Sequence, residues 1–481
     1  MELYKIISQL TESEYKELLS SFTSNKADKT ASFLSIIRKN PTTPDKEFLK
    51  THTDVSASAF YVLKSRLNKK VEAFLLNRVG DPNLDVISRV LKANETIFEN
   101  SRQISIAALN HLEKELLRLD FPYGLMVMYK LMQNLHAFDE DSYDEFGKKY
   151  SKQVAYSVAM DKASDLIVQF FRSFDSYMLT HKDEDHTRML RVMEKIDNLS
   201  NLYDSHRLYI FKAIIHLYGK LFIELNSDLR CELEKTEVIF DKAFDILTTY
   251  QEDPFYKNIH LLFDYLRYMY LEKEQKDKAK FYYELLDFKI DELMTGYHHN
   301  ANTSLFLYSK LRFHIQNNTP QRLLADVEQY LSNIEVDQYR PAFYINYQMF
   351  LAYTHFLNHN YSKSNRILYS LRNTISFRKF VHSDLEVKFL LAIGYCMAQD
   401  TELANQLIMS LQRQLRVDES GKYEHCKVLL KILTVAVGSR SSTRRKNLEK
   451  YIPQWKAENV GKHAILADLN LASVFLDGGD F

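Results

Sequence analysis

Two stretches of the chain, 350-FLAYTHFLNHNYSKSNRILYSLRN-373 and 390-LLAIGYCMAQDTELANQLIMSLQRQL-415, share one design. Each opens with an apolar segment, passes through a short polar turn, and continues with apolar or small residues spaced three and four apart. That spacing places these side chains on one face of an α-helix. Each stretch is therefore predicted to form two antiparallel helices joined by a short turn.

The spacing of the second helix recurs through the C-terminal half of the sequence. Apolar or small residues stand at i, i+4 and i+7 in Phe240/Phe244/Leu247, Ala279/Tyr283/Leu286, Leu323/Val327/Tyr330, Ser364/Leu368/Leu371, Ala404/Ile408/Leu411 and Leu448/Ile452/Trp455. Their first residues follow one another after 39, 44, 41, 40 and 44 positions. Helix pairs repeated at such a period bury faces that no single pair could cover, so the sequence predicts stacked helix pairs.

The composition indicates an all-α fold. The 481 residues include only 11 glycines and 8 prolines, whereas folds made of strands and tight turns need many of both. Apolar residues (46%) suffice for buried cores, and charged residues (26%) are ordinary for a surface, which excludes disorder for most of the chain. A single core stops growing at roughly 250–300 residues, so several packing units are expected.

Polar and turn-forming stretches divide the chain into three predicted parts. Gly80-Asp81-Pro82 closes a small helical unit over residues 1–80, and the hydrophilic stretch 181–186 precedes the repeated half. We predict a helical region packed on the repeats over residues 81–204. The helical repeats themselves are predicted over residues 205–481.

Charge and cysteine content narrow the expected partners and compartment. The 63 basic and 63 acidic residues cancel, so the field that draws a protein to nucleic acid or to an acidic membrane surface is absent, and nucleic acid is not an expected partner. Cys231, Cys396 and Cys426 are odd in number and far apart, which disfavours a disulfide framework or a zinc site. No apolar run has the roughly 18 residues that a signal anchor or membrane span needs. We expect a cytoplasmic protein with no membrane segment.

The best units resemble tetratricopeptide repeats. The resemblance rests on Leu351-Ala352, His355, Tyr361, Ser364, Leu368 and Leu371, on Leu391-Ala392, Tyr395, Thr401, Ala404, Ile408 and Leu411, and on Leu266, Tyr270, Ala279, Tyr283 and Leu286. In that family, small residues let paired helices approach closely and large ones interlock with the next pair. The period here is nearer 40 than the family's roughly 34, and Ala352, Ala392 and Arg267 replace the glycine of the first helix. The resemblance covers residues 205–477.

This resemblance implies an α-α superhelix whose concave face binds a protein or peptide. The positions that would face the concave surface are Asp264, Tyr268, Asn346, Met349, Tyr353, Phe389 and Ile393. Tyr and Met are common contact residues in protein interfaces. The alternative is that these side chains pack under neighbouring helices, because aromatic rings are also core residues.

A second candidate patch lies on the predicted helix SASAFYVLKSRLNKKVEAFLL. Its apolar residues form one stripe, and Arg66, Lys69 and Lys70 stand on the opposite side. Because shorter helices precede it, this helix could enter a nucleic-acid groove as the last element of a helix-turn-helix. A solvated face opposite an apolar stripe is the commoner origin of such charges.

Motifs for catalysis and cofactor binding do not occur in the sequence. No GxxxxGK[ST], GxGxxG or GxSxG is present, and we expect no catalytic residue, cofactor or metal. His181 and His186 lack the i, i+4 spacing of a metal pair, and their polar surroundings predict a solvated turn. The predicted function is a non-catalytic scaffold that binds a protein or peptide. The alternative is a peptide-sensing regulator whose N-terminal helices bind DNA or a partner, and the oligomeric state is left open.

Overall fold

The computed structural model of the protein describes residues 2–10, 12–23, 28–39, 44–53, 55–78, 84–223, 233–251, 253–257, 259–295, 303–329, 331, 336, 338–417, 421–438, 441–461 and 463–476. Helices are the only regular secondary structure in these residues, as the composition predicted. Two residues named above, Cys231 and Tyr330, lie outside the described part of the chain.

The helices follow one another without a break in type. The first are α1 (Glu2–Gln9), α2 (Glu12–Thr23), α3 (Asp28–Lys39), α4 (Pro44–Thr51), α5 (Ala57–Arg78), α6 (Leu84–Glu99), α7 (Arg102–Arg118), α8 (Pro122–Leu135) and α9 (Glu140–Thr180). The middle ones are α10 (Asp183–Leu202), α11 (His206–Phe222), α12 (Thr236–Thr249), α13 (Pro254–Lys257), α14 (Ile259–Glu274), α15 (Lys276–Phe288) and α16 (Ile290–Thr295). The last are α17 (Leu305–Gln316), α18 (Pro320–Gln329), α19 (Pro341–Leu357), α20 (Tyr361–Thr374), the 3-10 helix η3 (Phe377–Lys379), α21 (Val381–Met397), α22 (Thr401–Val417), α23 (Cys426–Gly438), α24 (Ser441–Glu458) and α25 (Leu471–Phe475).

Contacts between residues divide the chain into two compact units. Unit 1 contains Met1–Phe170 and Leu190–Ala301, and unit 2 contains Phe171–Met189 and Asn302–Phe481. Helix α9 therefore begins in unit 1 and ends in unit 2. The boundary predicted near residue 204 does not coincide with this division.

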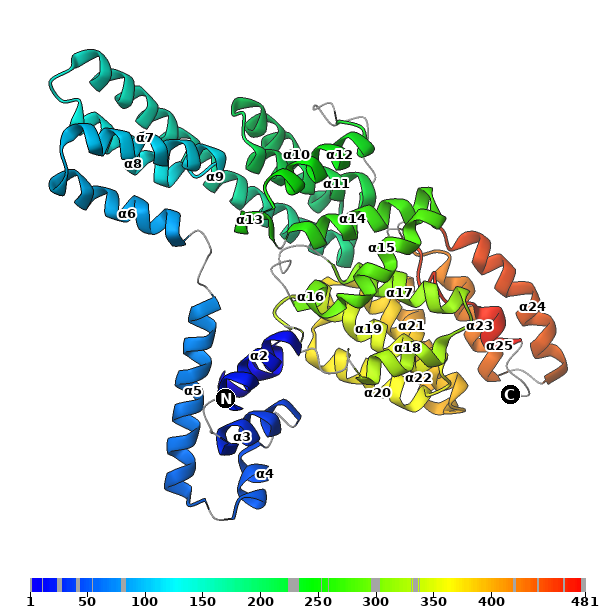
Figure 1. The fold of residues 1–481 in the computed structure, drawn as a ribbon. Helices are drawn as coiled ribbons and strands as arrows, with labels where there is room; N and C mark the ends of the chain where they lie inside the picture. The colour runs from blue at the N-terminus through cyan, green and yellow to red at the C-terminus, as the bar shows by residue number, and fades with distance from the viewer. Residues whose placement is uncertain are drawn as a thin grey trace. The chain divides into compact units, whose positions relative to one another are not determined.

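In unit 1, the first five helices share an aromatic core. The Phe33 ring of α3 lies 5.0 Å from the Phe48 ring of α4 and 5.1 Å from the Phe60 ring of α5, between centroids. Figure 1 shows α5 running alongside α2, α3 and α4. Such ring pairs bury a large area and fix which face of α5 points inward.

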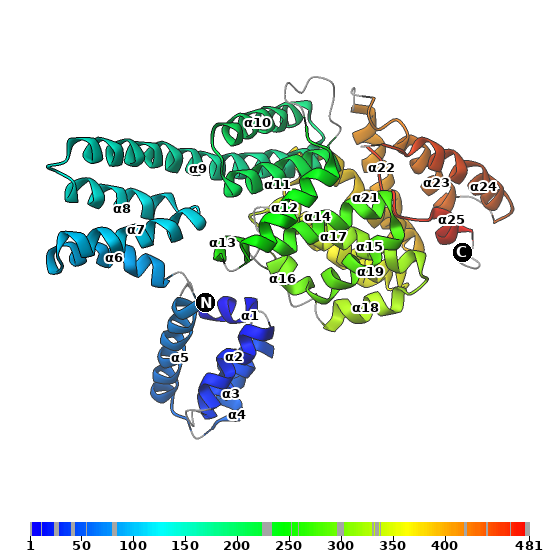
Figure 2. The same ribbon diagram turned by 45° about the horizontal axis from the view of Figure 1, so that its top comes forward.

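Helices α6, α7 and α8, also in unit 1, form a second apolar core. Leu109, Leu112 and Leu116 of α7 are buried in one cluster with Met128 and Met132 of α8. The α7–α8 pair lies beside α6 and the first half of α9 in both views (Figures 1 and 2). This core leaves the outer faces of α6 and α7 exposed.

A buried polar network joins the turn before α8, helix α9 and the start of α11 in unit 1. The hydroxyls of Tyr156 and Ser205 both donate to Asp120 Oδ2, each at 2.6 Å. Ser205 Oγ also caps α11 by accepting from the Leu208 N–H at 3.1 Å. These hydrogen bonds satisfy polar groups whose burial would otherwise be costly.

In unit 2, the C-terminal helices pack on the helices that precede and follow them in the sequence. Helix α19 packs on α20, α21 on α22, and α23 on α24, while α20 meets α21 and α22 meets α23 (Figure 1). The predicted repeat residues are buried in these pairs: Ser364, Leu368, Leu371, Ala404, Ile408, Leu411, Leu448, Ile452 and Trp455. The predicted packing of consecutive helices is confirmed for α19 to α24.

Gly394 allows α20 and α21 to approach closely. A Cβ atom at this position would lie 2.1 Å from Asn365 Oδ1 and 3.1 Å from Asn365 Cγ. Asn365 is itself buried, so its amide has little space into which to move. The approach of the two helices therefore depends on the missing side chain.

We expect Gly394→Ala to lower the free energy of unfolding by about 1–3 kcal/mol, the usual effect of overpacking, despite alanine's better helix propensity. Gly438→Ala is the matched control, because no atom lies within 4 Å of a Cβ at that position. Urea unfolding followed by circular dichroism measures both variants. A loss no larger than that of the control would contradict the close approach.

Candidate functional site

The predicted partner-binding residues of unit 2 lie on two helices. Asn346, Met349 and Tyr353 stand at i, i+3 and i+7 on α19, and Phe389 and Ile393 are four residues apart on α21. Asn346 is half-buried, whereas the other four side chains are at most 3% exposed. Neighbouring segments cover these four, as the packing alternative stated, so they are inaccessible to a partner in this structure.

The other two predicted residues, Asp264 and Tyr268, lie on α14 in unit 1. Tyr268 is buried, and its ring lies 5.9 Å from the Tyr283 ring of α15, between centroids. Asp264 is half-buried, and desolvation raises the pKa of its carboxyl above its usual value. Tyr268 thus packs α14 on α15, and Asp264 keeps partial exposure.

The C-terminal segment, residues 459–476, crosses three helices of unit 2. Its Asp468 pairs with Arg312 of α17, with Nη1 and Oδ2 3.7 Å apart. The backbone N–H of its Leu466 donates a hydrogen bond to the Glu386 carboxylate of α21. These two contacts place the segment against α17 and α21.

The third helix is α19, which the segment meets at Tyr353. The negative charges of Glu386 and Asp468 add to desolvation in raising the pKa of Tyr353, and the same two groups act on Tyr308 of α17. Because charges act strongly only at short range, these side chains lie close together. We call the surface formed by Tyr308, Arg312, Tyr353 and Glu386 the α17–α19–α21 face.

Apolar side chains of the C-terminal segment are buried along with these polar contacts. They are Ile465, Leu466, Leu469, Leu471 and Phe475, each at most 8% exposed. The segment is short of helix until α25 begins at Leu471. It therefore lies on unit 2 as a largely extended strap with apolar anchors.

Four histidines gather where the strap meets other parts of unit 2. The His181 ring, just after α9, lies 4.3 Å from the His382 ring of α21 and 5.2 Å from the His463 ring of the strap, between centroids. His425, before α23, donates to the backbone carbonyl of His463. The Tyr423 hydroxyl lies 3.3 Å from His382 Nδ1. We call these four histidines the histidine cluster.

The prediction of a solvated turn at His181 is wrong. This side chain is 7% exposed, because rings from α21 and the strap cover the end of α9. The local sequence is polar, but contacts with distant segments decide the burial of this residue.

Desolvation keeps the histidine cluster uncharged. It lowers the pKa of His382 well below the usual value, and the neighbouring His181, His463 and His425 lower it further. Desolvation also lowers the pKa of His425. A proton added to one ring makes the next proton harder to add, because like charges repel in a buried site.

Glu386 has the opposite behaviour. Desolvation raises the pKa of its carboxyl to about 7, the hydrogen bond from Leu466 N–H opposes this rise, and Asp468 adds to it. Its Oε2 lies 3.9 Å from His382 Nε2. The strap is thus held beside groups that gain or lose protons near neutral pH.

The predicted basic patch lies on the surface of α5. Arg66, Lys69 and Lys70 are exposed, while Leu67 between them is buried. The Lys70 Nζ atom lies 4.6 Å from the centre of the Phe22 ring, a cation–π contact with the α1–α5 core. Arg66 and Lys69 remain as exposed positive charges.

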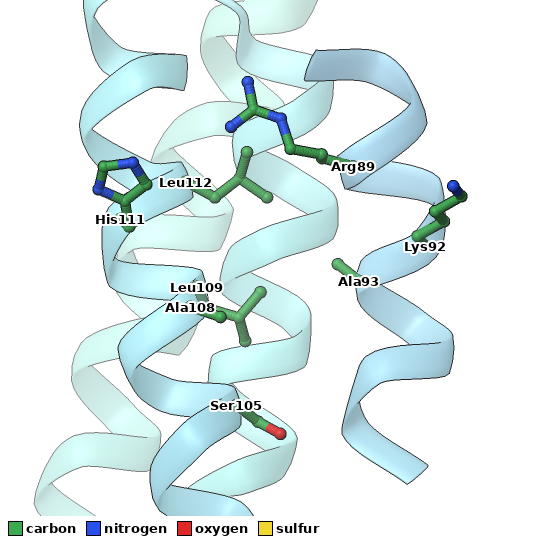
Figure 3. Close-up of a pocket in the computed structure, with 8 residues that line it drawn as sticks. All are labelled: Arg89, Lys92, Ala93, Ser105, Ala108, Leu109, His111 and Leu112. Atoms are coloured by element: carbon green, nitrogen blue, oxygen red, sulfur yellow. The ribbon is translucent and has the colours of Figure 1, made fainter. Parts of the chain in front are cut away.

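An apolar groove between α6 and α7 was not predicted from the sequence. Its volume is about 360 Å³, and it is lined by Arg89, Lys92, Ala93, Ser105, Ala108, Leu109, His111 and Leu112. Figure 3 shows Ala93 and Leu109 facing each other across the two helices, with Arg89 reaching from α6 toward α7 and Lys92 pointing away. Arg89 pairs with Glu115 of α7 at 2.7 Å. The groove combines a small-residue and leucine floor with a polar rim.

A second cavity, of about 410 Å³, lies in unit 2 and is mainly polar. Its lining includes Arg372, Arg378 and a hydrogen-bonded group of Asp384, Lys388 and Gln414. The side chains with the largest pKa shifts, such as His382 and Glu386, line neither of the two cavities. The two cavities therefore give no specific support to an enzymatic site.

Among the residues that the structure describes, no group of three or more His, Cys, Asp or Glu side chains is arranged to hold a metal ion. His298 and His299 lie outside those residues.

No described helix combines the length and the apolar character that crossing a membrane requires.

Comparison with known proteins gives no match: no family model matches the chain, and neither a curated protein nor a solved structure does. The tetratricopeptide resemblance therefore rests on the residues quoted above and on the packing of consecutive helices.

We expect the stability of unit 2 to fall as the pH drops below about 6.5. Unfolding returns His382 and His425 to the usual histidine pKa of 6.5, so it takes up protons and acid favours it. Each proton contributes up to about 1.4 kcal/mol per pH unit. Glu386 acts oppositely: its contribution is complete below its usual pKa of 4.5 and is lost as the pH rises through about 7. Two histidines against one carboxyl leave a net loss on the acid side.

Trp455, the single tryptophan, is buried in α24 and reports this transition by fluorescence during urea unfolding. His382→Asn should reduce the acid-side slope by about one proton. His359→Asn is the control, because His359 is exposed and has a φ of 58°, which asparagine tolerates. Equal slopes for the two variants would show that the histidine cluster does not set the pH dependence.

Proposed function

We propose that this protein is a non-catalytic scaffold that binds another protein. Its frame would be a tetratricopeptide-like superhelix of helix pairs, and its open binding site would be the α6–α7 groove. The observation that carries the proposal is this groove, about 360 Å³ in volume with an apolar floor. Apolar concavities on an exposed surface are typical of sites that bind a partner.

The floor of the groove suits an amphipathic helix. Ala93, Ser105 and Ala108 are small, so a ligand side chain can approach the α6 and α7 backbones closely. Leu109 and Leu112 supply the apolar contact. Ile104 stands four residues before Ala108 on the same face of α7 and is 58% exposed. It extends the apolar surface beyond the groove, as helix-in-groove recognition requires.

Further apolar side chains are exposed on the same helices and on α9. They are Leu91, Leu117, Tyr123, Val127, Tyr143 and Val158, each at least 37% exposed. Single exposed apolar residues are ordinary, but a series of them around a groove favours a protein ligand over a small molecule.

Ala108→Phe tests the proposal, because Ala108 is exposed and lines the groove. A phenylalanine there fills the groove without entering the core, so we expect recovery of the partner to fall at least tenfold. Affinity capture from the native cell with quantitative mass spectrometry measures it. Ala107→Phe is the matched control, since Ala107 is exposed and does not line the groove. Equal recovery with the two variants would refute the groove as the binding site.

The α5 patch favours a second candidate function, a regulator whose N-terminal helices bind nucleic acid. Residues 1–80 contain 13 Lys or Arg and 9 Asp or Glu, and no acidic residue occurs from 57 to 71. In the described part of the chain, neither Arg66 nor Lys69 forms an ion pair. An exposed helix with unpaired positive charges is the electrostatic footprint of phosphate binding.

Fluorescence anisotropy with a labelled DNA duplex tests this second candidate. We expect Arg66→Glu combined with Lys69→Glu to weaken binding at least tenfold and to reduce the salt slope by about two. Lys46→Glu combined with Lys50→Glu makes the same change in charge at exposed positions of α4 and is the control. The candidate fails where wild-type protein does not bind DNA or where both pairs lose affinity equally.

A further inference from the structure

The C-terminal strap lies on the helix surface at which the sequence places partner-binding residues. Glu386, Phe389 and Ile393 stand at i, i+3 and i+7, so they share one side of α21. The strap contacts that side through the hydrogen bond from Leu466 N–H to Glu386. Tyr353 of α19 lies within the influence of Asp468. The burial of the predicted residues is therefore accompanied by occupation of their surface by this chain's own C-terminal residues.

The strap has the chemistry of a bound peptide. The sequence 463-HAILADLNLASVF-475 offers apolar side chains at Ile465, Leu466 and Leu469, all buried, and a carboxylate at Asp468 that meets Arg312. Affinity in such complexes comes from a few anchors in pockets, and register comes from a charged pair. Both elements are present here.

Several contacts that hold the strap are polar or strained, so they can be exchanged. Leu466 has a φ of 51°, which an L-residue with a bulky side chain adopts at a cost in energy. The Arg312–Asp468 pair is partly exposed, and such pairs contribute little to stability. The remaining polar contacts run through the histidine cluster and Glu386.

We propose that residues 463–475 are an intramolecular ligand of the α17–α19–α21 face. When the strap leaves, this face binds a segment of another protein with the same chemistry: two adjacent apolar residues, an acidic residue two positions later, and a leucine after it. The pattern is that of Ile465-Leu466-Ala467-Asp468-Leu469. This proposal concerns a different surface from the α6–α7 groove, so either one can fail while the other holds.

Protons set how firmly the strap is held. The titratable groups that face His382 are His181 from the end of α9, Tyr423 and His425 from the segment before α23, His463 from the strap, and Glu386 from α21 itself. Glu458 faces His425, and the Asp468–Arg312 pair stands beside Glu386. Strap release lets the histidines regain water and accept protons, so acid favours the released state. Ionised Glu386 favours release on the alkaline side, which places the firmest closure near pH 6.5–7.

The test measures binding of a fluorescein-labelled peptide, residues 463–475, to the full chain by anisotropy at pH 7. Combined Ile465→Ser and Leu469→Ser in the chain removes the strap's anchors and leaves the face unchanged. We expect this variant to bind the peptide at least tenfold more tightly than wild type. Adding Arg312→Glu should weaken that binding at least tenfold, because the partner of Asp468 reverses its charge. Val460→Ser, at an exposed position before the strap, is the control and should bind as wild type does.

Hydrogen exchange of the wild-type protein supplies a second measurement that needs no variant. Amides of residues 463–475 should exchange at least tenfold faster than those of α19 and α21, and faster at pH 5.5 than at pH 7 after correction for the intrinsic rate. Strap amides as protected as the two helices, or equal peptide affinity for wild type and the doubly substituted chain, would overturn the proposal.

Discussion

Helices α19 and α21 are buried on more sides than one neighbour can cover, and the architecture of unit 2 follows from this constraint. Of the 17 residues of α21, 12 are buried, and α19 buries 11 of its 17. An amphipathic surface helix needs apolar cover along one stripe only. Helices α20 and α22 supply cover through the pairs they form with α19 and α21. The strap supplies more of it, with Ile465, Leu466 and Leu469 as its apolar contribution.

Cover by a segment without regular structure has a polar cost that helix pairs avoid. A helix satisfies most of its own backbone groups, whereas an extended strap must find partners for each one. Here Asn459 both donates to and accepts from Ile465, at 2.8 and 2.7 Å, and Leu466 N–H reaches Glu386. The histidine cluster extends the same solution, because neutral imidazole can donate and accept at a small cost of burial. The polar groups that complete the core are therefore the ones that titrate near neutral pH.

Local periodicity explains what the sequence could predict. The triplets Ser364/Leu368/Leu371 and Ala404/Ile408/Leu411 are buried, because a 3.6-residue period fixes which side of a helix faces its neighbour. The exposure of Arg66 and Lys69 opposite Leu67 follows from the same rule. Periodicity could not reveal that His181 meets His382 or that Leu466 meets Glu386, because these contacts join segments far apart in the chain. The α6–α7 groove escaped for a related reason: Ala93, Ser105 and Ala108 become a cavity only once two helices are placed side by side. The apolar residues of 463-HAILADLNLASVF-475, which lie between the predicted repeats and the C-terminus, were the available signal for the strap.

An uncovered α17–α19–α21 face would present Tyr353, Phe389 and Ile393 to solvent together, and a contiguous apolar surface of that kind promotes association with unrelated chains. A tethered strap prevents this and also sets a threshold. Its effective concentration beside the face is of the order of millimolar, so a partner must exceed that competition to bind. Weak and abundant segments are thereby rejected, while a segment that matches the strap's anchors and its carboxylate can exchange with it. In this arrangement selectivity comes from an internal competitor, and a shift in pH changes the threshold without altering the binding surface.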